Sequence, residues 1–279
     1  MFLLSFFKIY VIIETESQKG VPMKQFTKDH YIGSGAIVAR ERTIQGEYIP
    51  HRHEFYELEY ILSGSGIYRI DDREYQIASG MLFFTTPFHF HSVSASNCRI
   101  YNVMFSEELC DTDFLIRLLY QTTLPALDTN EMEEGFFRTV LSELVNADKS
   151  SVYTAYLLNS LLGKLATYQT ETPRLGVPIQ RAMLYLLHHF RQNPTLAQTA
   201  AYVGYAPSYF SAVFKAEVGV GFKEYLDRLR FDYAKKMILH SKMPIVQVCR
   251  ESGFEDYPNF IRRFKKRFGI SPTEMMGTS

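Results

Sequence analysis

The sequence of 279 residues lacks tryptophan and contains only three cysteines, Cys98, Cys110 and Cys249. An odd number of cysteines without metal-ligand spacing argues against a disulfide scaffold and fits a reducing compartment. The chain also lacks a Gly-rich phosphate loop, zinc-finger spacing and the nucleophile elbow of serine hydrolases. These absences argue against P-loop nucleotide-binding, zinc-finger and serine-hydrolase proteins.

Long apolar runs are missing as well. The stretch from Phe2 to Ile13 is apolar, but Lys8 interrupts it, and it is shorter than the roughly 20 residues that span a bilayer. It has neither the basic start nor the small-residue cleavage site of a signal peptide. We therefore expect no membrane segment and a cytoplasmic location. Residues 1–22 are interpreted as an N-terminal extension, and the choice between Met1 and Met23 as the true start stays open.

The zero net charge conceals an asymmetry between two parts of the chain. Residues 174–279 contain 16 Lys and Arg against 8 Asp and Glu, a net charge of +8, and residues 1–173 carry the compensating −8. A basic C-terminal third favours polyanionic partners, although a solvated basic surface would explain the same count. The charge pattern therefore predicts two domains with different partners.

Residues 23–106 show short apolar runs separated by turn residues, which is typical of a sandwich or barrel. Residues 107–169 change to helical periodicity, and the Thr- and Pro-containing residues 170–177 resemble a linker. We interpret the helical region as a dimerisation region, because one predicted helix has a broad apolar face. The alternative is that this face packs on its own barrel. The face consists of Leu157, Leu158, Leu161, Leu162 and Leu165.

Histidines and a carboxylate recur at regular spacing in the predicted strands. Alternation along a strand places His51 and His53 on one face and brings His91 to a matching face. The spacing Gly-x4-His-x-His-x3-Glu-x6-Gly, which begins at Gly46, resembles the first cupin motif, and residues 80–91 resemble the second. By that resemblance a divalent metal would have four ligands. They are His51, His53, Glu57 and His91.

The same residues could instead bind an organic effector or pocket waters without metal. We expect the effector to contact His51, His53, Glu57, Tyr68 and His91. Aromatic side chains would supply the apolar wall of such a pocket. Those expected in the wall are Tyr56, Tyr60, Tyr68 and Phe83.

The last hundred residues repeat themselves. Leu196, Ala200 and Gly204 recur as Ile245, Cys249 and Gly253 at an offset of 49. In each copy an apolar stripe, a Gly turn and a pair of phenylalanines one turn apart predict a helix-turn-helix, whose second helix enters the major groove. The two units span about residues 195–217 and 245–268, and a continuous helix over about 222–240 joins them. Such a helix is about 28 Å long, close to the ~34 Å between successive major grooves on one face of DNA.

On these residues the stretch 178–279 resembles the DNA-binding domain of AraC/XylS transcription regulators, most specifically in residues 219–230 and 253–272. Residues 51–58 are similar to the start of that family's cupin sensor. The resemblance implies a two-domain fold: an N-terminal all-β cupin-like barrel with appended helices, and a C-terminal all-α domain of two helix-turn-helix units joined by a long helix. It implies a transcription regulator, more often an activator, controlled by a small-molecule effector in the barrel. The partners it implies are double-stranded DNA, an effector with a sugar as one candidate, a second copy of the chain and RNA polymerase.

Helix faces predict which side chains meet DNA. On the second recognition helix, Phe260, Phe264 and Phe268 are expected inside, and Arg262 matches a family position that commonly contacts bases. On the first, the outward residues are short. An alternative is therefore that this unit contacts phosphates and no bases. The predicted DNA-facing residues are Ser208, Ser211, Ala212 and Lys215 on the first helix, and Asn259, Arg262, Arg263 and Lys266 on the second.

Two other classes of function compete with this interpretation. A metal-dependent cupin enzyme, an oxygenase or isomerase, would use the same histidines and Glu57. Such an enzyme would not need two linked helix-turn-helix units. A purely architectural DNA binder leaves the barrel without a role. We expect a regulator and no catalytic residues. The sequence does not specify the effector, the operator or the sign of regulation.

Overall fold

The computed structural model describes residues 24–26, 31–32, 36–119, 125–129, 134–168, 175–241 and 243–277. These residues form two compact units, divided between Thr172 and Pro173. The N-terminal extension, residues 1–22, and most of the expected linker, residues 170–177, lie outside the described residues. Within the described ranges, no helix has the length and apolar character needed to cross a bilayer.

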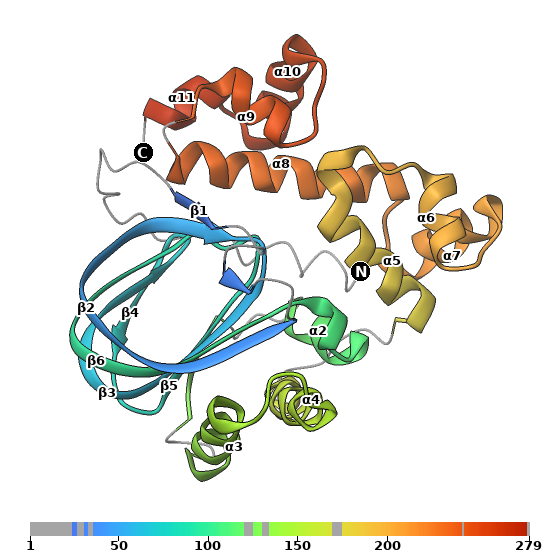
Figure 1. Cartoon of the computed structure of the whole chain (residues 1–279). Coiled ribbons are helices and arrows are strands. Elements are labelled where there is room, and N and C mark those ends of the chain that lie inside the picture. Colours follow the sequence, from blue (N-terminus) through green and yellow to red (C-terminus); the bar gives the residue numbers. More distant parts are fainter. Residues whose placement is uncertain are drawn as a thin grey trace. The chain divides into compact units, whose positions relative to one another are not determined.

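The N-terminal unit is built on one curled, mostly antiparallel sheet (Figure 1). Among the described residues it has seven strands in the order β1-β2-β6-β3-β5-β7, with β4 paired to β3. Among the strands that the structure describes, only the pair β1 and β2 runs parallel. This sheet is the all-β part of the predicted fold class, which is confirmed. The strands are β1 (Lys24–Phe26), β2 (Ile37–His53), β3 (Tyr56–Ile70), β4 (Arg73–Ile77), β5 (Met81–Thr85), β6 (His91–Phe105) and β7 (Ala126–Asp128).

The long strands are continuous where the sequence predicts turns. Gly64 is one of the turn residues between the short apolar runs of the sequence, but it lies inside β3 at a register irregularity against β6. Gly64 has φ +106°, and a Cβ on it would lie 2.5 Å from the Cys98 Cα. The glycine therefore allows two strands to approach closely at a bend.

Short helices follow the long strands. They are η3 (Glu107–Leu109), α2 (Thr112–Leu119), α3 (Glu134–Asn146) and α4 (Val152–Thr167). Helix α3 packs against β2 and β6, and α4 contacts both α2 and α3. Four of the five leucines of the expected dimerisation face are almost completely buried within this unit, namely Leu158, Leu161, Leu162 and Leu165. The leucine face is therefore used internally, because these small helices need it for their own core.

The C-terminal unit consists of helices. They are α5 (Val177–His189), η4 (Phe190–Gln192), α6 (Leu196–Tyr202), α7 (Pro207–Val218), α8 (Phe222–His240), α9 (Ile245–Glu251), α10 (Tyr257–Phe268) and α11 (Pro272–Gly277). Helices α6–α7 and α9–α10 form the two repeats, with α8 between them in sequence (Figure 1). Gly219 and Gly269 end α7 and α10 in the left-handed conformation. The paired phenylalanines of each repeat, Phe210 with Phe214 and Phe260 with Phe264, are fully buried.

Candidate functional site

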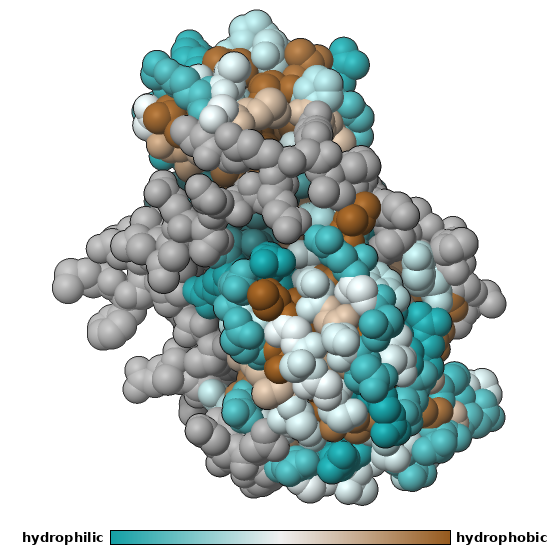
Figure 2. Space-filling model, turned by 90° about the vertical axis from the view of Figure 1, so that its left-hand side faces the viewer, coloured by the Kyte–Doolittle hydropathy of each residue, from teal (hydrophilic) through white to brown (hydrophobic). Residues whose placement is uncertain are grey.

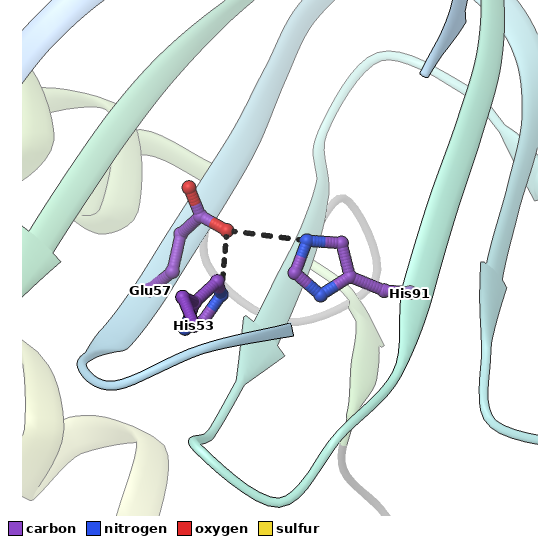
Figure 3. A group of neighbouring side chains, drawn as sticks. All are labelled: His53, Glu57 and His91. Atoms are coloured by element: carbon purple, nitrogen blue, oxygen red, sulfur yellow. Dashed lines mark hydrogen bonds and ion pairs between the residues drawn. The ribbon is translucent and has the colours of Figure 1, made fainter. Parts of the chain in front are cut away.

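Three predicted residues meet inside the sheet at a single carboxylate oxygen. Glu57 Oε2 lies 3.2 Å from His53 Nε2 and 3.6 Å from His91 Nε2. His53 ends β2, Glu57 is near the start of β3 and His91 begins β6, so three strands contribute (Figure 3). All three side chains are buried. Their possible ligand atoms lie within 4.8 Å of one another, which is a geometry that could hold a metal ion.

The fourth predicted ligand, His51, is not part of this cluster. Its Nδ1 is 2.8 Å from the Ile49 carbonyl oxygen, and its ring packs edge-on against the His91 ring at 4.1 Å between centroids. Burial lowers the pKa of His51. Burial also lowers the pKa of His91 well below its usual value, and the neighbouring His51 and His53 add to this. The predicted set of four therefore becomes a cluster of three with His51 beside it.

Glu57 is held as a carboxylate. Asn102 Nδ2 donates to its Oε1 at 2.7 Å, and Thr85 Oγ1 donates to its Oε2 at 3.4 Å. Burial by itself would favour the neutral acid. The hydrogen bond from His53 and the electrostatic influence of His53, His91 and Arg42 outweigh this and lower the pKa of Glu57.

A second polar group lies beside the first. Tyr68 donates its hydroxyl hydrogen to Glu59 Oε2, and Arg42 contacts Glu59 Oε1 at 3.2 Å. Burial, and then the charge of Glu57, raise the pKa of Glu59 to about 7. Tyr68 is among the residues predicted from the sequence, whereas Arg42, Glu59, Thr85 and Asn102 are not. Alternation along β3 could have indicated Glu59, because residues 57 and 59 share a face.

The expected aromatic wall is only half correct. Tyr68 stacks on Phe83 with 4.2 Å between ring centroids, and both lie in an apolar core with Ile61 and Ile100. Tyr56, one residue before Glu57, stacks instead on Phe84 and Phe105. Tyr56 and Tyr60 alternate with Glu57 and Glu59 and so lie on the opposite face of the sheet.

The orientation of His53 fits a cation at this cluster. His53 Nδ1 is 2.6 Å from the Phe55 carbonyl oxygen, which can only accept, so Nδ1 carries hydrogen. His53 Nε2 then faces Glu57 Oε2, and two lone pairs would repel unless a proton or a metal ion lies between them. A backbone acceptor on the far nitrogen is also the usual support of metal-binding histidines. His91 Nδ1 is buried without a hydrogen-bond partner among the described residues.

The outer surface of the sheet contrasts with this interior. On the face of the molecule in Figure 2, apolar residues are scattered among polar ones. The middle of β2 is mostly exposed.

The second candidate site is the outward face of the recognition helices. On α10, Arg262 is exposed and donates to Asn259 Oδ1 at 2.9 Å, and Lys266 is exposed as well. On α7 the four predicted residues are exposed. Tyr209 lies beside them and was not predicted from the sequence; it is 57% exposed and packs edge-on against Tyr205. The predicted residues of α7 are Ser208, Ser211, Ala212 and Lys215.

Arg263 does not point outward as expected. Its guanidinium pairs with Asp227 of α8 and lies over the rings of Phe231, at 5.2 Å, and Phe254, at 5.9 Å. Helical periodicity predicts an outward Arg263 together with Asn259, Arg262 and Lys266. It does not anticipate that α8 supplies a carboxylate on the neighbouring face.

Comparisons with known proteins match both units. A family model described as "Helix-turn-helix domain" matches residues 179–277, and one described as "AraC-like ligand binding domain" matches residues 34–131. The HTH-type transcriptional activator RhaR of Enterobacter sp. (strain 638) is 25% identical over 91% of this chain and 96% of its own length. The HTH-type transcriptional regulator YfiF of Bacillus subtilis (strain 168) is 25% identical over 80% of this chain and 76% of its own.

Among solved structures, ToxT from Vibrio cholerae O395 is 16% identical. The alignment covers 86% of this chain and 97% of ToxT, with a TM-score of 0.37. The similarity to known proteins therefore rests on the sequence matches to RhaR and YfiF, and not on this structure.

Proposed function

Because this chain belongs to the AraC/XylS family of transcription regulators, we propose that its buried His53–Glu57–His91 cluster binds a small-molecule effector. The chain is a DNA-binding transcription regulator, as its curated relatives are. Effector binding would then alter how the helical unit binds its operator. The observation that supports this proposal is a buried group of titratable side chains in the part of the chain that matches the ligand-binding family model.

The chemistry of the cluster favours an effector rich in hydroxyl groups. Glu57 and Glu59 offer acceptors, whereas Asn102 and Arg42 offer donors, and Tyr68 adds an aromatic face beside them. Hydroxyl groups donate and accept at once, so they can satisfy both kinds of partner. A sugar is therefore our candidate class. The predicted contacts His51, His53, Glu57, Tyr68 and His91 remain the proposed binding residues.

For DNA, we propose that the exposed faces of α7 and α10 enter successive major grooves. Arg262 would contact bases, because arginine binds guanine through two hydrogen bonds. Asn259 and Lys266 flank it, and the exposed Lys215 would contact a phosphate. The short side chains of Ser208, Ser211 and Ala212 give α7 fewer base contacts.

We further propose that the regulator acts as a homodimer that contacts RNA polymerase, and that the barrel carries no catalytic activity. The curated relatives are transcription regulators, which supports a role without catalysis. The leucine face is internal, so a dimer would use another surface of α4. Its exposed apolar residues are Val152, Tyr153 and Tyr156.

A divalent metal at the cluster is the second candidate, favoured by the orientation of His53. The ligands would be His53 Nε2, Glu57 Oε2 and His91 Nε2, which are donor types suited to zinc or iron. Calorimetric titration of Zn²⁺ into EDTA-treated full-length chain tests this. Binding that is lost in His91→Ala and kept in His51→Ala would support the metal. No binding to the wild-type chain would reject it.

The effector proposal is tested with the full chain and a duplex that it selects from a randomised library. Pentoses and hexoses are screened for a change in duplex affinity measured by fluorescence anisotropy. We expect a sugar to change the affinity of the wild-type chain, and the double variant His53→Ala with His91→Ala to bind DNA but not respond. An equal response in the double variant would exclude the cluster, and no response to any sugar in the wild-type chain would exclude the sugar class.

A further inference from the structure

The basic residues of α10 differ in their contacts. Arg262, Lys265, Lys266 and Arg267 are exposed, whereas Arg263 is half-buried. Arg263 pairs with Asp227, and Arg267 Nη2 donates to Asp232 Oδ1 at 2.9 Å. Residues 263 and 267 are one turn apart on α10, and both acceptors lie on α8. We call Arg263, Arg267, Asp227 and Asp232 the α8–α10 clamp.

We propose that the α8–α10 clamp sets the rotation of the second recognition helix, so that Arg263 and Arg267 are positioning residues and not DNA contacts. The inference rests on the DNA-binding role of α10. Neighbouring residues on a helix point about 100° apart, so fixing Arg263 toward α8 turns Arg262 away from it. Arg262 is exposed as this requires. A base-reading arginine needs such a fixed direction, because two hydrogen bonds to one guanine tolerate little rotation.

Apolar packing alone leaves that rotation less well determined. The buried core of α10 consists of Phe260 and Phe264, and aromatic rings can repack against Phe231 with small changes of angle. Arg263 adds directional contacts to this core. It pairs with a carboxylate on one side and lies over Phe231 and Phe254 on the other. A planar guanidinium is suited to both contacts at once, which a lysine is not.

The first repeat lacks this arrangement. At the positions of Arg263 and Arg267, an offset of 50, α7 has Val213 and Glu217. Glu217 Oε2 accepts a hydrogen bond from the backbone of Gly176 at 2.7 Å, near the start of α5. Among the described residues no ion pair joins α7 to α8. The clamp therefore belongs to the repeat that has the long base-reading side chains, and is absent from the repeat whose outward residues are short.

Removal of the acid gives opposite results for the two possible roles of Arg263. If Arg263 contacts DNA, Asp227→Asn frees its guanidinium and removes a negative charge, so DNA binding strengthens. If Arg263 positions α10, the same change weakens binding to the preferred sequence. Glu224→Gln is the matched control, because Glu224 is an acid one turn earlier on α8 that pairs with Arg228.

The experiment uses the full chain, the duplex that the wild-type chain selects from a randomised library, and an unrelated duplex of equal length. We expect Asp227→Asn to weaken binding to the selected duplex about fivefold or more relative to Glu224→Gln. Binding to the unrelated duplex should stay within about twofold, because phosphate contacts remain. Arg263→Gln should lose the same preference without changing the slope of log K against log salt, whereas Lys266→Ala should lower that slope by about one.

Binding of Asp227→Asn to the selected duplex as tight as that of Glu224→Gln, or tighter, would overturn the positioning role. A reduced salt slope in Arg263→Gln would overturn it as well, since it would make Arg263 a phosphate contact. Asp232→Asn repeats the test at the more exposed pair should Asp227→Asn fail to fold. If the wild-type chain enriched no sequence from the library, the DNA-binding role itself would be rejected. Selection with the wild-type chain therefore distinguishes rejection of DNA binding from rejection of the positioning role of the α8–α10 clamp.

Discussion

His53 and Glu57 face each other inside the sheet, with His53 Nε2 lying 3.2 Å from Glu57 Oε2. The Phe55 carbonyl oxygen accepts a hydrogen bond from His53 Nδ1, so the contact of His53 Nε2 with Glu57 needs a proton or a metal ion between the two atoms. Asn102 and Thr85 add donors to the same carboxylate. The cluster is therefore an organised site in which the loss of one member leaves a buried charge without its partner.

The first prediction concerns the stability of this pair. His53→Ala should lower the free energy of unfolding of the N-terminal unit by about 2–4 kcal/mol, because Glu57 would stay buried without its main donor. His53→Ala together with Glu57→Gln should recover part of the loss, because the neutral amide needs less compensation. Urea unfolding followed by circular dichroism measures both. A double variant less stable than His53→Ala would show that Glu57 does not cause the loss.

The second prediction concerns the bend of β3. Gly64→Ala should destabilise the N-terminal unit by at least about 3 kcal/mol, since it adds strain at positive φ and a Cβ 2.5 Å from the Cys98 Cα. Gly46 is the matched control. It has φ +87° with nothing within 4 Å of an added Cβ, so Gly46→Ala should cost only about 1–2 kcal/mol. Equal losses in thermal unfolding would show that backbone strain alone matters at both sites.

The helical unit was the more predictable part of the fold. Each of its two repeats supports the prediction made for the other. Gly204 and Gly253, with φ +77° and +80°, follow equivalent helices, and phenylalanines at equivalent positions fill both cores. The sheet was less predictable. Glycine usually marks a turn, but Gly64 marks a bend inside β3, because pairing of both halves with β6 outweighs the local preference. Strand β7, which pairs with β5, has too few residues for a periodic signal.

Predictability of the sites followed the same division. His53, Glu57 and His91 could be found because their spacing resembles a known motif. Glu59 could have been found by alternation from Glu57 along one strand, whereas Asn102 could not, because its role depends on which strands become neighbours. The orientation of Arg263 depended on Asp227, which is 36 residues away in sequence. Sequence periodicity specifies the face of one helix but not what a neighbouring helix supplies.

The third prediction separates base contacts from phosphate contacts. Arg262→Ala should weaken binding of the full chain to its selected duplex by about 1–3 kcal/mol and relax specificity at one base pair. Lys215→Ala should weaken binding to all duplexes alike, because a phosphate contact carries no sequence information. Anisotropy titrations with selected and unrelated duplexes measure the two effects. Equal loss on both duplexes for Arg262→Ala would remove Arg262 from the base-reading role.

The fourth prediction concerns self-association through α4. Val152 and Tyr156 are 73% and 72% exposed and lie one turn apart, and Tyr153 between them is 50% exposed, whereas four of the five leucines of the same helix are buried. Large apolar side chains exposed together are typical of interaction surfaces, and a second copy would cover them. We therefore expect the wild-type chain to sediment as a dimer at micromolar concentrations.

Tyr156→Glu should shift that equilibrium toward monomer without lowering the unfolding temperature, because the side chain makes few contacts within its own unit. Tyr209→Glu is the control for adding one negative charge at an exposed tyrosine, and it should remain dimeric. Leu161→Ala should instead lower the stability of the fold by about 2–5 kcal/mol, because Leu161 is fully buried. A monomeric wild-type chain would reject the dimer. A Tyr156→Glu variant that stays dimeric would place the interface on a surface other than α4.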